Sequence, residues 1–333
     1  MNIKLGFILK NLSENQQNEI KSLKHSEYQA LFALPYFQVG GERSIHNIKD
    51  YDLFYEVLII SYHTNIPLIN TCLSRSSSKK LGELLRILKE NYTEQPLRKT
   101  FIKDGRKIAL IKGKKKLSTY EKRTLSFSKK TSFSKRVFDF DYENAMVNYK
   151  DSVLEYFKGN YSKFHHQEKL NFEDSCKQVI FEDFDNSGNN NEIVFRGNRA
   201  QKSNYNQFTT IIDLKDQLKN KKYDVSFWYY SDMDTTSHIM CFVNEQQFGK
   251  PGKWSNVTDT KVNYLHYGKW SFVEFSIRPI YPNGRQKIML KGQQKYFNPP
   301  IFFDQILIKE EGLDVYMNYN GELFKNNYPV GKL

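Results

Sequence analysis

The spacing of hydrophobic positions changes along the chain and separates a first half from a second. Residues 30–39 and 66–73 are short apolar runs, typical of buried strands. Within residues 51–64 the apolar positions instead recur at helical spacing. Strand-like and helix-like runs alternate in this way as far as residue 141, which predicts a small α/β domain over residues 1–141.

Turn and cap signals predict further elements inside this first domain. Asp104-Gly105, within residues 97–112, is a strong short signal for a β-hairpin. Ser118 followed by Glu121 is a capping box that predicts a helix start. The weakly amphipathic segment 142–169 then predicts a helical linker, so the domain boundary is expected near residue 170.

Residues 170–333 have a different pattern, in which short apolar runs are separated by Asn, Gly, Asp and Pro clusters. Runs of this length with turn signals between them predict an antiparallel β-sandwich. The eight runs are QVIFEDF, NEIVFRG, FTTIIDL, YDVSFWYY, HIMCFV, WSFVEFSI, QKIMLKG and IFFDQILI.

The order of four strings in this half resembles the carbohydrate-binding-module jelly roll, in the group of CenC-like modules. The strings are FEDF, YDVSFWYY, KW followed by VEFSI, and IFFDQILI, over residues 178–310. The resemblance implies a jelly-roll sandwich, glycan binding on one sheet face or at loop ends, and often one structural Ca²⁺. Carried onto this sequence, the calcium ligands would be Glu182 and Asp304. Gln305 stands where the family often has a second acid, and ordinary edge carboxylates are the alternative.

The strand YDVSFWYY is aromatic on both faces, which bears on glycan binding. Side chains alternate along a strand, so Trp228 and Tyr230 share the face opposite the core-facing residues. Flat rings on such a face could stack on sugars, and Trp254, Tyr264 and Tyr267, in a loop-like stretch, would complete the surface. The alternative is that the linker helix or the first domain covers Trp228 and Tyr230. Residues 301–308, apolar on both faces, favour this alternative.

The net charge of +13 is concentrated in one segment of the first domain. Residues 79–136 contain 19 Lys and Arg side chains against 5 Asp and Glu. An anionic membrane surface is one partner that such a basic flank favours, and a solvated lysine-rich face is the alternative. The segment has none of the nucleic-acid-binding signatures, so we expect no nucleic-acid partner. Ser74, Arg75 and Ser76, between a strand and a helix, form a candidate anion site, with a capped polar loop as the alternative.

The sequence contains no motif that assigns a catalytic role. It lacks HExxH, GxSxG, a nucleotide-binding glycine loop and metal-binding cysteine spacing, so catalysis is less favoured than binding. No apolar run approaches the length of a membrane span, and we expect a soluble chain without a secretory signal.

Three function classes therefore remain open. The leading one is a non-catalytic carbohydrate-binding protein, which the resemblance would place at the cell envelope or exterior. The second is the soluble C-terminal region of a membrane glycosyltransferase-like or glycan-processing system. Residues 28–140 resemble such tails in the strings LPYFQVGGE and IPLINTCLSR. The third is a protein-interaction scaffold.

Overall fold

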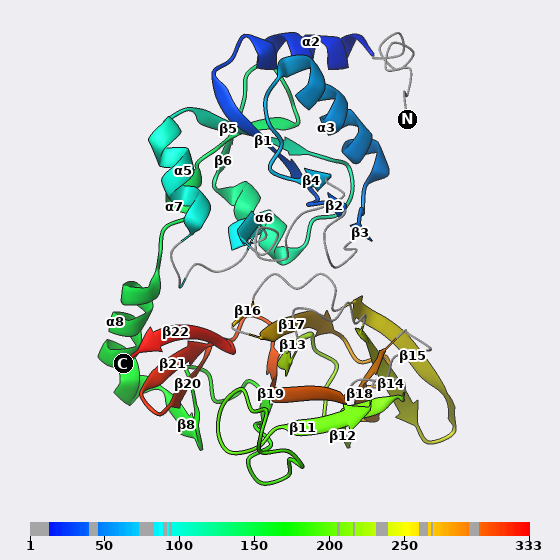
Figure 1. The fold of residues 1–333 in the computed structure, drawn as a ribbon. Coiled ribbons are helices and arrows are strands. Elements are labelled where there is room, and N and C mark those ends of the chain that lie inside the picture. The colour runs from blue at the N-terminus through cyan, green and yellow to red at the C-terminus, as the bar shows by residue number, and fades with distance from the viewer. Residues whose placement is uncertain are drawn as a thin grey trace. The chain divides into compact units, whose positions relative to one another are not determined.

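The structure is a computed structural model of the chain, drawn as a ribbon in Figure 1. It forms two compact units, Met1–Val147 and Asn148–Leu333. The residues it describes are 13–39, 46–72, 83–84, 86–88, 92, 95–204, 207–215, 217–230, 239–259, 266–267, 269–292 and 300–333.

The first unit combines helices with a four-stranded sheet of order β1-β5-β7-β6. Strands β1 and β5 pair in parallel, whereas β5–β7 and β7–β6 are antiparallel. The helices are α2 (Glu14–Lys24), α3 (Tyr51–Thr64), the 3₁₀ turn η1 (Arg86–Leu88), α5 (Pro96–Asp104), α6 (Thr119–Ser126) and α7 (Tyr142–Ala145). The strands are β1 (Tyr28–Leu34), β2 (Gln38–Val39), β3 (His46–Asn47), β4 (Thr71–Cys72), β5 (Lys107–Lys112), β6 (Ser128–Lys130) and β7 (Val137–Phe140).

Two predicted helices of this unit are confirmed, and both begin at a capped residue. The run of helical spacing over 51–64 is α3, and Asp50 caps it by accepting the backbone N–H of Leu53. Ser118 and Glu121 form the predicted capping box of α6. Glu121 is almost fully buried and also accepts the backbone N–H of Tyr36 at 2.7 Å, so one carboxylate joins the helix start to the segment after β1.

The predicted hairpin at Asp104-Gly105 is wrong. Asp104 is the last residue of α5, and Gly105 is its left-handed C-cap, with φ of 76° and its N–H donated to the carbonyl of Phe101. The chain leaves this cap directly into β5. A left-handed glycine ends a helix as readily as it closes a two-residue hairpin, because both turns require a positive φ.

The predicted linker, residues 142–169, contains α7, helix α8 (Lys150–Asn160), the turn η2 (Tyr161–Lys163) and strand β8 (His165–Gln167). The boundary between the compact units falls after Val147, inside this segment. Helix α8 belongs to the second unit. Its Phe157 ring lies 5.5 Å from that of Tyr316, and Phe164, just after η2, lies 5.2 Å from the same ring.

The second unit is a β-sandwich, as predicted, with an additional sheet. One sandwich sheet has the order β10-β19-β13-β17-β16, with β11 also paired to β19, and the other has the order β12-β18-β14-β15. The third sheet has the order β22-β21-β20-β9-β8. The bounds are β9 (Leu170–Phe172), β10 (Val179–Glu182), β11 (Gln201–Asn204), β12 (Thr209–Leu214), β13 (Tyr223–Tyr230), β14 (Ile239–Gln247), β15 (Lys250–Asp259), β16 (His266–Tyr267), β17 (Trp270–Ile277), β18 (Arg285–Gly292), β19 (Pro300–Glu310), β20 (Val315–Tyr319), β21 (Glu322–Lys325) and β22 (Tyr328–Lys332).

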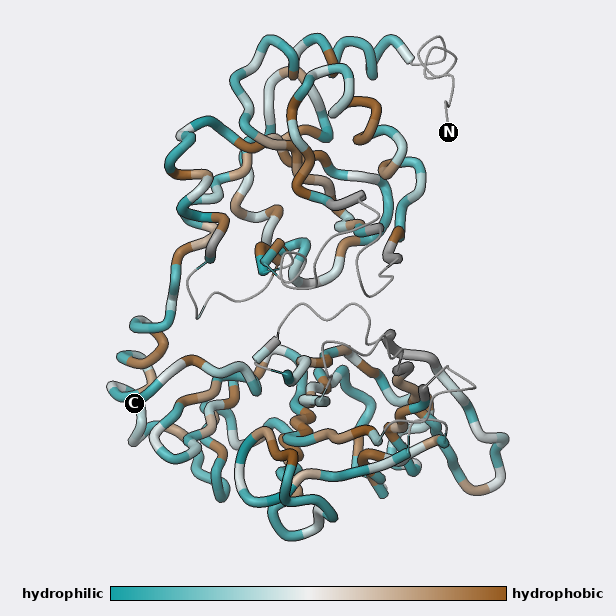
Figure 2. The backbone as a smooth tube through the Cα atoms, in the orientation of Figure 1, coloured by the Kyte–Doolittle hydropathy of each residue, from teal (hydrophilic) through white to brown (hydrophobic). Residues whose placement is uncertain are grey.

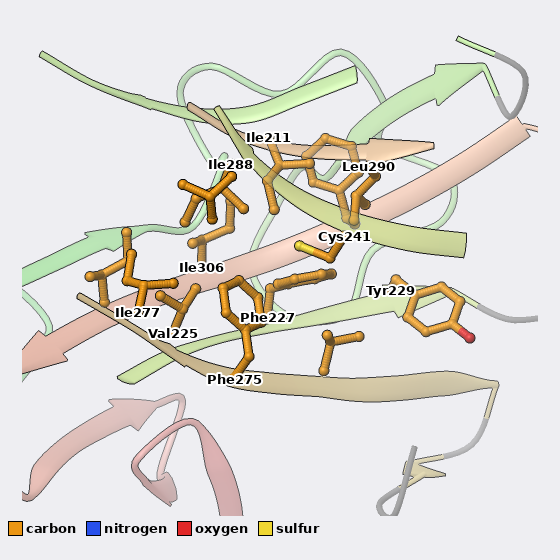
Figure 3. Close-up of a cluster of buried hydrophobic side chains, with 14 of the residues drawn as sticks. Ile211, Val225, Phe227, Tyr229, Cys241, Phe275, Ile277, Ile288, Leu290 and Ile306 are labelled. Atoms are coloured by element: carbon orange, nitrogen blue, oxygen red, sulfur yellow. The ribbon is translucent and has the colours of Figure 1, made fainter. Parts of the chain in front are cut away.

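The sandwich core lies between its two sheets (Figure 3). Val225 and Phe227 of β13 project into it from one sheet, and Cys241 of β14 and Leu290 of β18 from the other. Tyr223, Val225, Phe227 and Tyr229 are therefore the core-facing set of β13, as the alternation predicts. In Figure 2 the hydrophobic stretches of the second unit lie toward its interior, and hydrophilic residues predominate in its peripheral loops.

The third sheet covers the face of β13 that points away from this core. The side chain of Asn327, between β21 and β22, donates to the backbone carbonyl of Gln305 at 2.7 Å. Tyr328 donates its hydroxyl to Glu274 of β17, and its ring lies 4.4 Å from that of Phe272. Strand β19 is buried on both faces for this reason.

One predicted strand of the sandwich is not a strand. Residues 191–197, NEIVFRG, form a bent loop that is held by an isolated bridge between Asn190 and Ala200. The loop carries Phe195 onto the covered face of β13. Its apolar run reflects this buried aromatic side chain and not a place in a sheet.

Candidate functional site

Trp228 is fully buried and cannot contact a ligand, so its prediction as an exposed sugar-binding ring is wrong. Phe195 stacks on it with ring centroids 4.3 Å apart and an interplanar angle of 15°. Its indole N–H donates to the backbone carbonyl of Asn327 at 3.1 Å. Burial of this face was the alternative expectation, but the cover is the third sheet and the Phe195 loop of the same unit.

Tyr230 and Tyr267 lie near Trp228, at the β16 end of the same sheet. Tyr230 is half-buried, with its ring 5.6 Å from Trp270 and 6.0 Å from Phe302. Tyr267 is 42% exposed, and the Arg196 guanidinium lies 4.8 Å from its ring. Tyr264 lies outside the described residues. Tyr230 and Tyr267 therefore lie on the same sheet as Trp228. Trp254 lies on the other sandwich sheet.

Trp254 belongs to the other sandwich sheet, in β15 and not in a loop. It pairs with Asn244 of β14, whose neighbour Val243 faces the core. Trp254 and Asn244 therefore point to the outer side of the sheet β12-β18-β14-β15. We call this outer surface, with Phe208, Phe242 and Trp254, the Trp254 face.

Three aromatic rings lie together on the Trp254 face. The ring of Phe208, just before β12, lies 5.3 Å from Trp254 and 5.4 Å from Phe242. Trp254 is 56% exposed and Phe208 44%, while Phe242 is half-buried between strands. These are large apolar surfaces that solvent reaches on a pleated sheet, unlike the ring of Trp228. Phe208 and Phe242 were not among the predicted site residues.

Polar side chains border the three rings. Asn244 lies in one cross-strand row between Trp254 of β15 and Lys287 of β18. Gln246, two residues further along β14, is exposed and donates its amide to the Asn244 side-chain oxygen at 3.0 Å. An amide with a remaining N–H and a carbonyl oxygen beside an exposed indole can hydrogen-bond to hydroxyl groups.

The charge of the Trp254 face is positive. Lys291 of β18 lies 4.5 Å from the centroid of the Phe208 ring, and Lys287 lies four residues earlier on the same side of the strand. Arg285 is paired with Asp213 of β12, and the Arg285 hydrogen bonds hold the pKa of Asp213 below its usual range. Lys287 lies opposite Asp213 and also lowers its pKa, but the direct ion pair of Asp213 is with Arg285. Lys291 forms no ion pair with any described residue.

Glu182 and Asp304, the predicted calcium ligands, do not fit a shared ion. Glu182 is in register with Ile306, which faces the sandwich core, whereas Asp304 is in register with Trp228 on the opposite face of the sheet. The described residues contain no cluster of three or more His, Cys, Asp or Glu side chains arranged to hold a metal.

Asp304 instead anchors the loop that covers Trp228. Its carboxylate accepts the backbone N–H groups of Phe195 at 2.9 Å, Arg196 at 3.2 Å and Gln305 at 2.8 Å. Burial raises the pKa of Asp304 to about 8, and the three hydrogen bonds oppose that rise. Glu182 has a comparable local role, since it accepts the N–H of Phe184 and the hydroxyl of Ser187.

The candidate anion site at Ser74, Arg75 and Ser76 lies outside the described residues. No helix among the described residues is long and apolar enough to cross a membrane. The basic flank, residues 79–136, is described in part, and it includes α5, β5, α6 and β6 of the first unit.

Comparisons with known proteins give weak structural similarities only. No family model matches the sequence. No curated protein matches it, so the resemblance of residues 28–140 to glycosyltransferase-like tails gains no support.

Among solved structures, the chain is similar to the CBM22-1 xylan-binding domain from Paenibacillus barcinonensis Xyn10C, at 11% identity and a TM-score of 0.28, over 44% of this chain and 89% of that one. It is similar to TmCBM61 in complex with β-1,4-galactotriose at 15% identity and a TM-score of 0.23, over 46% of this chain and 94% of that one. The infectious bursal disease virus VP2 subviral particle is matched at 10% identity and a TM-score of 0.27, over 45% of this chain and 39% of that one. Scores this low identify neither a shared fold nor a ligand.

Proposed function

We propose that this protein is a non-catalytic carbohydrate-binding protein and that the glycan lies on the Trp254 face. The observation that carries the proposal is the exposed Trp254 ring, with Phe208 and Phe242 beside it on the surface of a regular sheet. Flat aromatic rings present an apolar surface to the C–H face of a pyranose. The exposed amide of Gln246, which buried Asn244 holds in place, suits its hydroxyls.

The positive charge beside the rings favours a glycan that bears carboxylate or sulfate groups. Lys287 and Lys291 flank the aromatic surface, and the carboxylate nearest to them, Asp213, is already paired with Arg285. An acidic sugar stacked on Trp254 would extend across β14 toward the two lysines on β18, because these strands are adjacent. A neutral glycan would use the rings and the Gln246 amide alone.

Affinity electrophoresis of the full chain through gels that contain single polysaccharides tests the proposal. We expect retardation by at least one acidic polysaccharide, such as polygalacturonate, alginate or hyaluronan. Trp254→Ala should weaken it about tenfold or more, because truncating a central aromatic contact typically costs 2 kcal/mol or more.

The matched control is Phe248→Ala, since Phe248 is a fully exposed aromatic residue between β14 and β15, outside the Trp254 face. Retardation that survives Trp254→Ala, or that is lost equally with Phe248→Ala, would rule out the Trp254 face as the binding site. Binding of proteins in place of any polysaccharide would favour the interaction-scaffold alternative.

A further inference from the structure

The first unit contains a cavity of about 690 Å³ that is unrelated to the Trp254 face. It lies at the edge of the sheet where β1 and β5 begin, and residues 26–28, 105–107 and 129–133 form its walls. The volume is in the range of small-molecule sites. Strands β1 and β5 are parallel, so this is their amino end, opposite to the end at which ligands of α/β sheets usually bind.

A network of hydrogen bonds around Asp139 forms one side of the cavity. The hydroxyl of Tyr28 donates to one carboxylate oxygen of Asp139 at 2.6 Å, and the Lys107 ammonium donates to the other at 2.7 Å. Burial raises the pKa of Asp139, but these two hydrogen bonds outweigh it and hold the pKa below the usual range. Asp139 is therefore ionised at neutral pH and fully engaged by its neighbours.

The lining of the cavity carries a positive excess. It includes four basic side chains, Arg106, Lys107, Lys129 and Lys130, and two carboxylates, Glu27 and Asp139. Arg106 is paired with Asp104, and Lys107 with Asp139. Lys129 of β6 lies opposite Asp139 and helps to lower its pKa without a direct ion pair, and Lys130 forms no ion pair with any described residue. Lys129 and Lys130 therefore carry the positive charge of the lining that is not held in ion pairs.

The wall that carries these lysines is fixed by contacts outside the cavity. Both the backbone N–H and the hydroxyl of Thr131 donate to the carbonyl of Val137, which closes the β6–β7 turn. Arg136, in the same turn, pairs with Glu19 of α2 at 2.7 Å and with Glu56 of α3. A turn held in this way presents Lys129, Lys130 and the Ser132 hydroxyl without first having to be ordered.

We propose that this cavity binds a phosphate monoester. At neutral pH a phosphate monoester carries close to two negative charges, and Lys129 and Lys130 are the two basic side chains of the lining that are not held in ion pairs. Its oxygens accept hydrogen bonds from ammonium, guanidinium and hydroxyl donors, all of which line the cavity. The ester can belong to a soluble metabolite or to a lipid headgroup.

Titration of the full chain with inorganic phosphate at constant ionic strength, followed by amide NMR shifts, tests the proposal. We expect saturable shifts at residues 105–107 and 129–133. The double variant Lys129→Met/Lys130→Met should bind at least about fivefold more weakly. The control is Lys114→Met/Lys116→Met, which removes the same charge from two exposed lysines outside the cavity. Absence of saturable shifts, or equal weakening in both variants, would overturn the proposal.

Sedimentation with vesicles distinguishes the two sources of the phosphate. Binding to phosphatidylcholine vesicles that contain phosphatidic acid, displaced by free phosphate and lost in Lys129→Met/Lys130→Met, identifies a lipid headgroup. Saturable phosphate binding without vesicle binding identifies a soluble ester. Vesicle binding that both double variants retain equally would show a general attraction of the basic flank, and would contradict a specific site.

Discussion

At the scale of single residues, Trp228 and Trp254 show what strand alternation predicts and what it leaves open. Alternation correctly separated Trp228 from the core-facing residues of β13. It gave no information about what covers the second face, because the cover comes from Phe195 and from residues near Asn327, far away in sequence. Trp254 was expected in a loop beside Trp228, whereas it is an exposed residue of β15 in the other sheet, and β15 lacks the continuous apolar run that would have revealed a strand.

Truncation of the two tryptophans should change the free energy of unfolding by very different amounts. Trp228→Ala should lower the free energy of unfolding by about 3–5 kcal/mol, because it leaves a large cavity beneath the third sheet. Trp254→Ala should change it by less than about 0.5 kcal/mol, because the side chain is mostly exposed. Urea unfolding of both variants measures the difference. Equal costs would mean that Trp228 is not buried as described.

The second unit should become less stable as pH rises, because Asp304 loses a proton that the folded state holds more tightly than the unfolded state. Its pKa is about 8 in the folded state against an ordinary value of 3.8, so the folded state binds more protons between these pH values. The stability contributed by protonation is therefore present below about pH 4 and lost progressively toward pH 8. The difference in unfolding free energy between wild type and Asp304→Asn, measured from pH 4 to 8, should change accordingly. A difference independent of pH would contradict this assignment.

At the scale of elements, two Asx-Gly pairs form different structures. Asp104-Gly105 was predicted as a hairpin and ends a helix, whereas Asn320-Gly321, which the prediction overlooked, joins β20 to β21 with positive φ at both residues. The dipeptide specifies left-handed backbone, and the flanking pattern decides which element it terminates. The pair Asn320-Gly321, between alternating runs, was the signal that could have revealed the third sheet.

Gly321→Ala should cost about 1 kcal/mol of unfolding free energy, because an alanine at positive φ is strained even with open space around its Cβ. Gly249→Ala is a matched variant, since Gly249 has a similar positive φ and open space in the turn between β14 and β15. Thermal or chemical denaturation measures both. A neutral Gly321→Ala would show that the turn is not held in this conformation.

The row of basic residues on β18 should determine preference among glycans. Lys287→Met/Lys291→Met should weaken binding of an acidic polysaccharide by about tenfold, by removing two charges beside the rings, and should leave a neutral one unaffected. Lys219→Met/Lys332→Met, at two exposed positions elsewhere in the unit, is the control. If acidic glycan binding persists in the first variant while Trp254→Ala abolishes it, the acidic preference is wrong and the binding face still stands.

At the scale of the whole molecule, the pattern change near residue 170 predicted two parts, and the structure forms two compact units. The sandwich could be predicted because its strands are short, alternating and separated by turn residues. The exact boundary between the two units could not be predicted. Helix α8 packs on β20 through Phe157, Phe164 and Tyr316, and one sequence does not show which neighbour an amphipathic helix packs against.

This packing predicts how fragments behave. A fragment 148–333 keeps α8, η2 and β8, whereas 170–333 loses them and exposes the buried Tyr316 ring. We expect the shorter fragment to be less stable by about 3–5 kcal/mol, comparable to the loss of one large buried aromatic side chain. Denaturant unfolding of the two fragments compares them. Equal stability would place α8 outside the folded unit.

The location of a bound glycan distinguishes the Trp254 face from the sheet that contains Trp228. The chain has three tryptophans, Trp228, Trp254 and Trp270, so its amide NMR spectrum contains three indole N–H signals. Titration with a fragment of whichever polysaccharide retards the chain should shift the Trp254 signal and the amides of Phe208 and Phe242, and leave the Trp228 signal unchanged. Shifts that cluster instead at Tyr230, Tyr267 and Trp270, with Trp254 unaffected, would contradict the account.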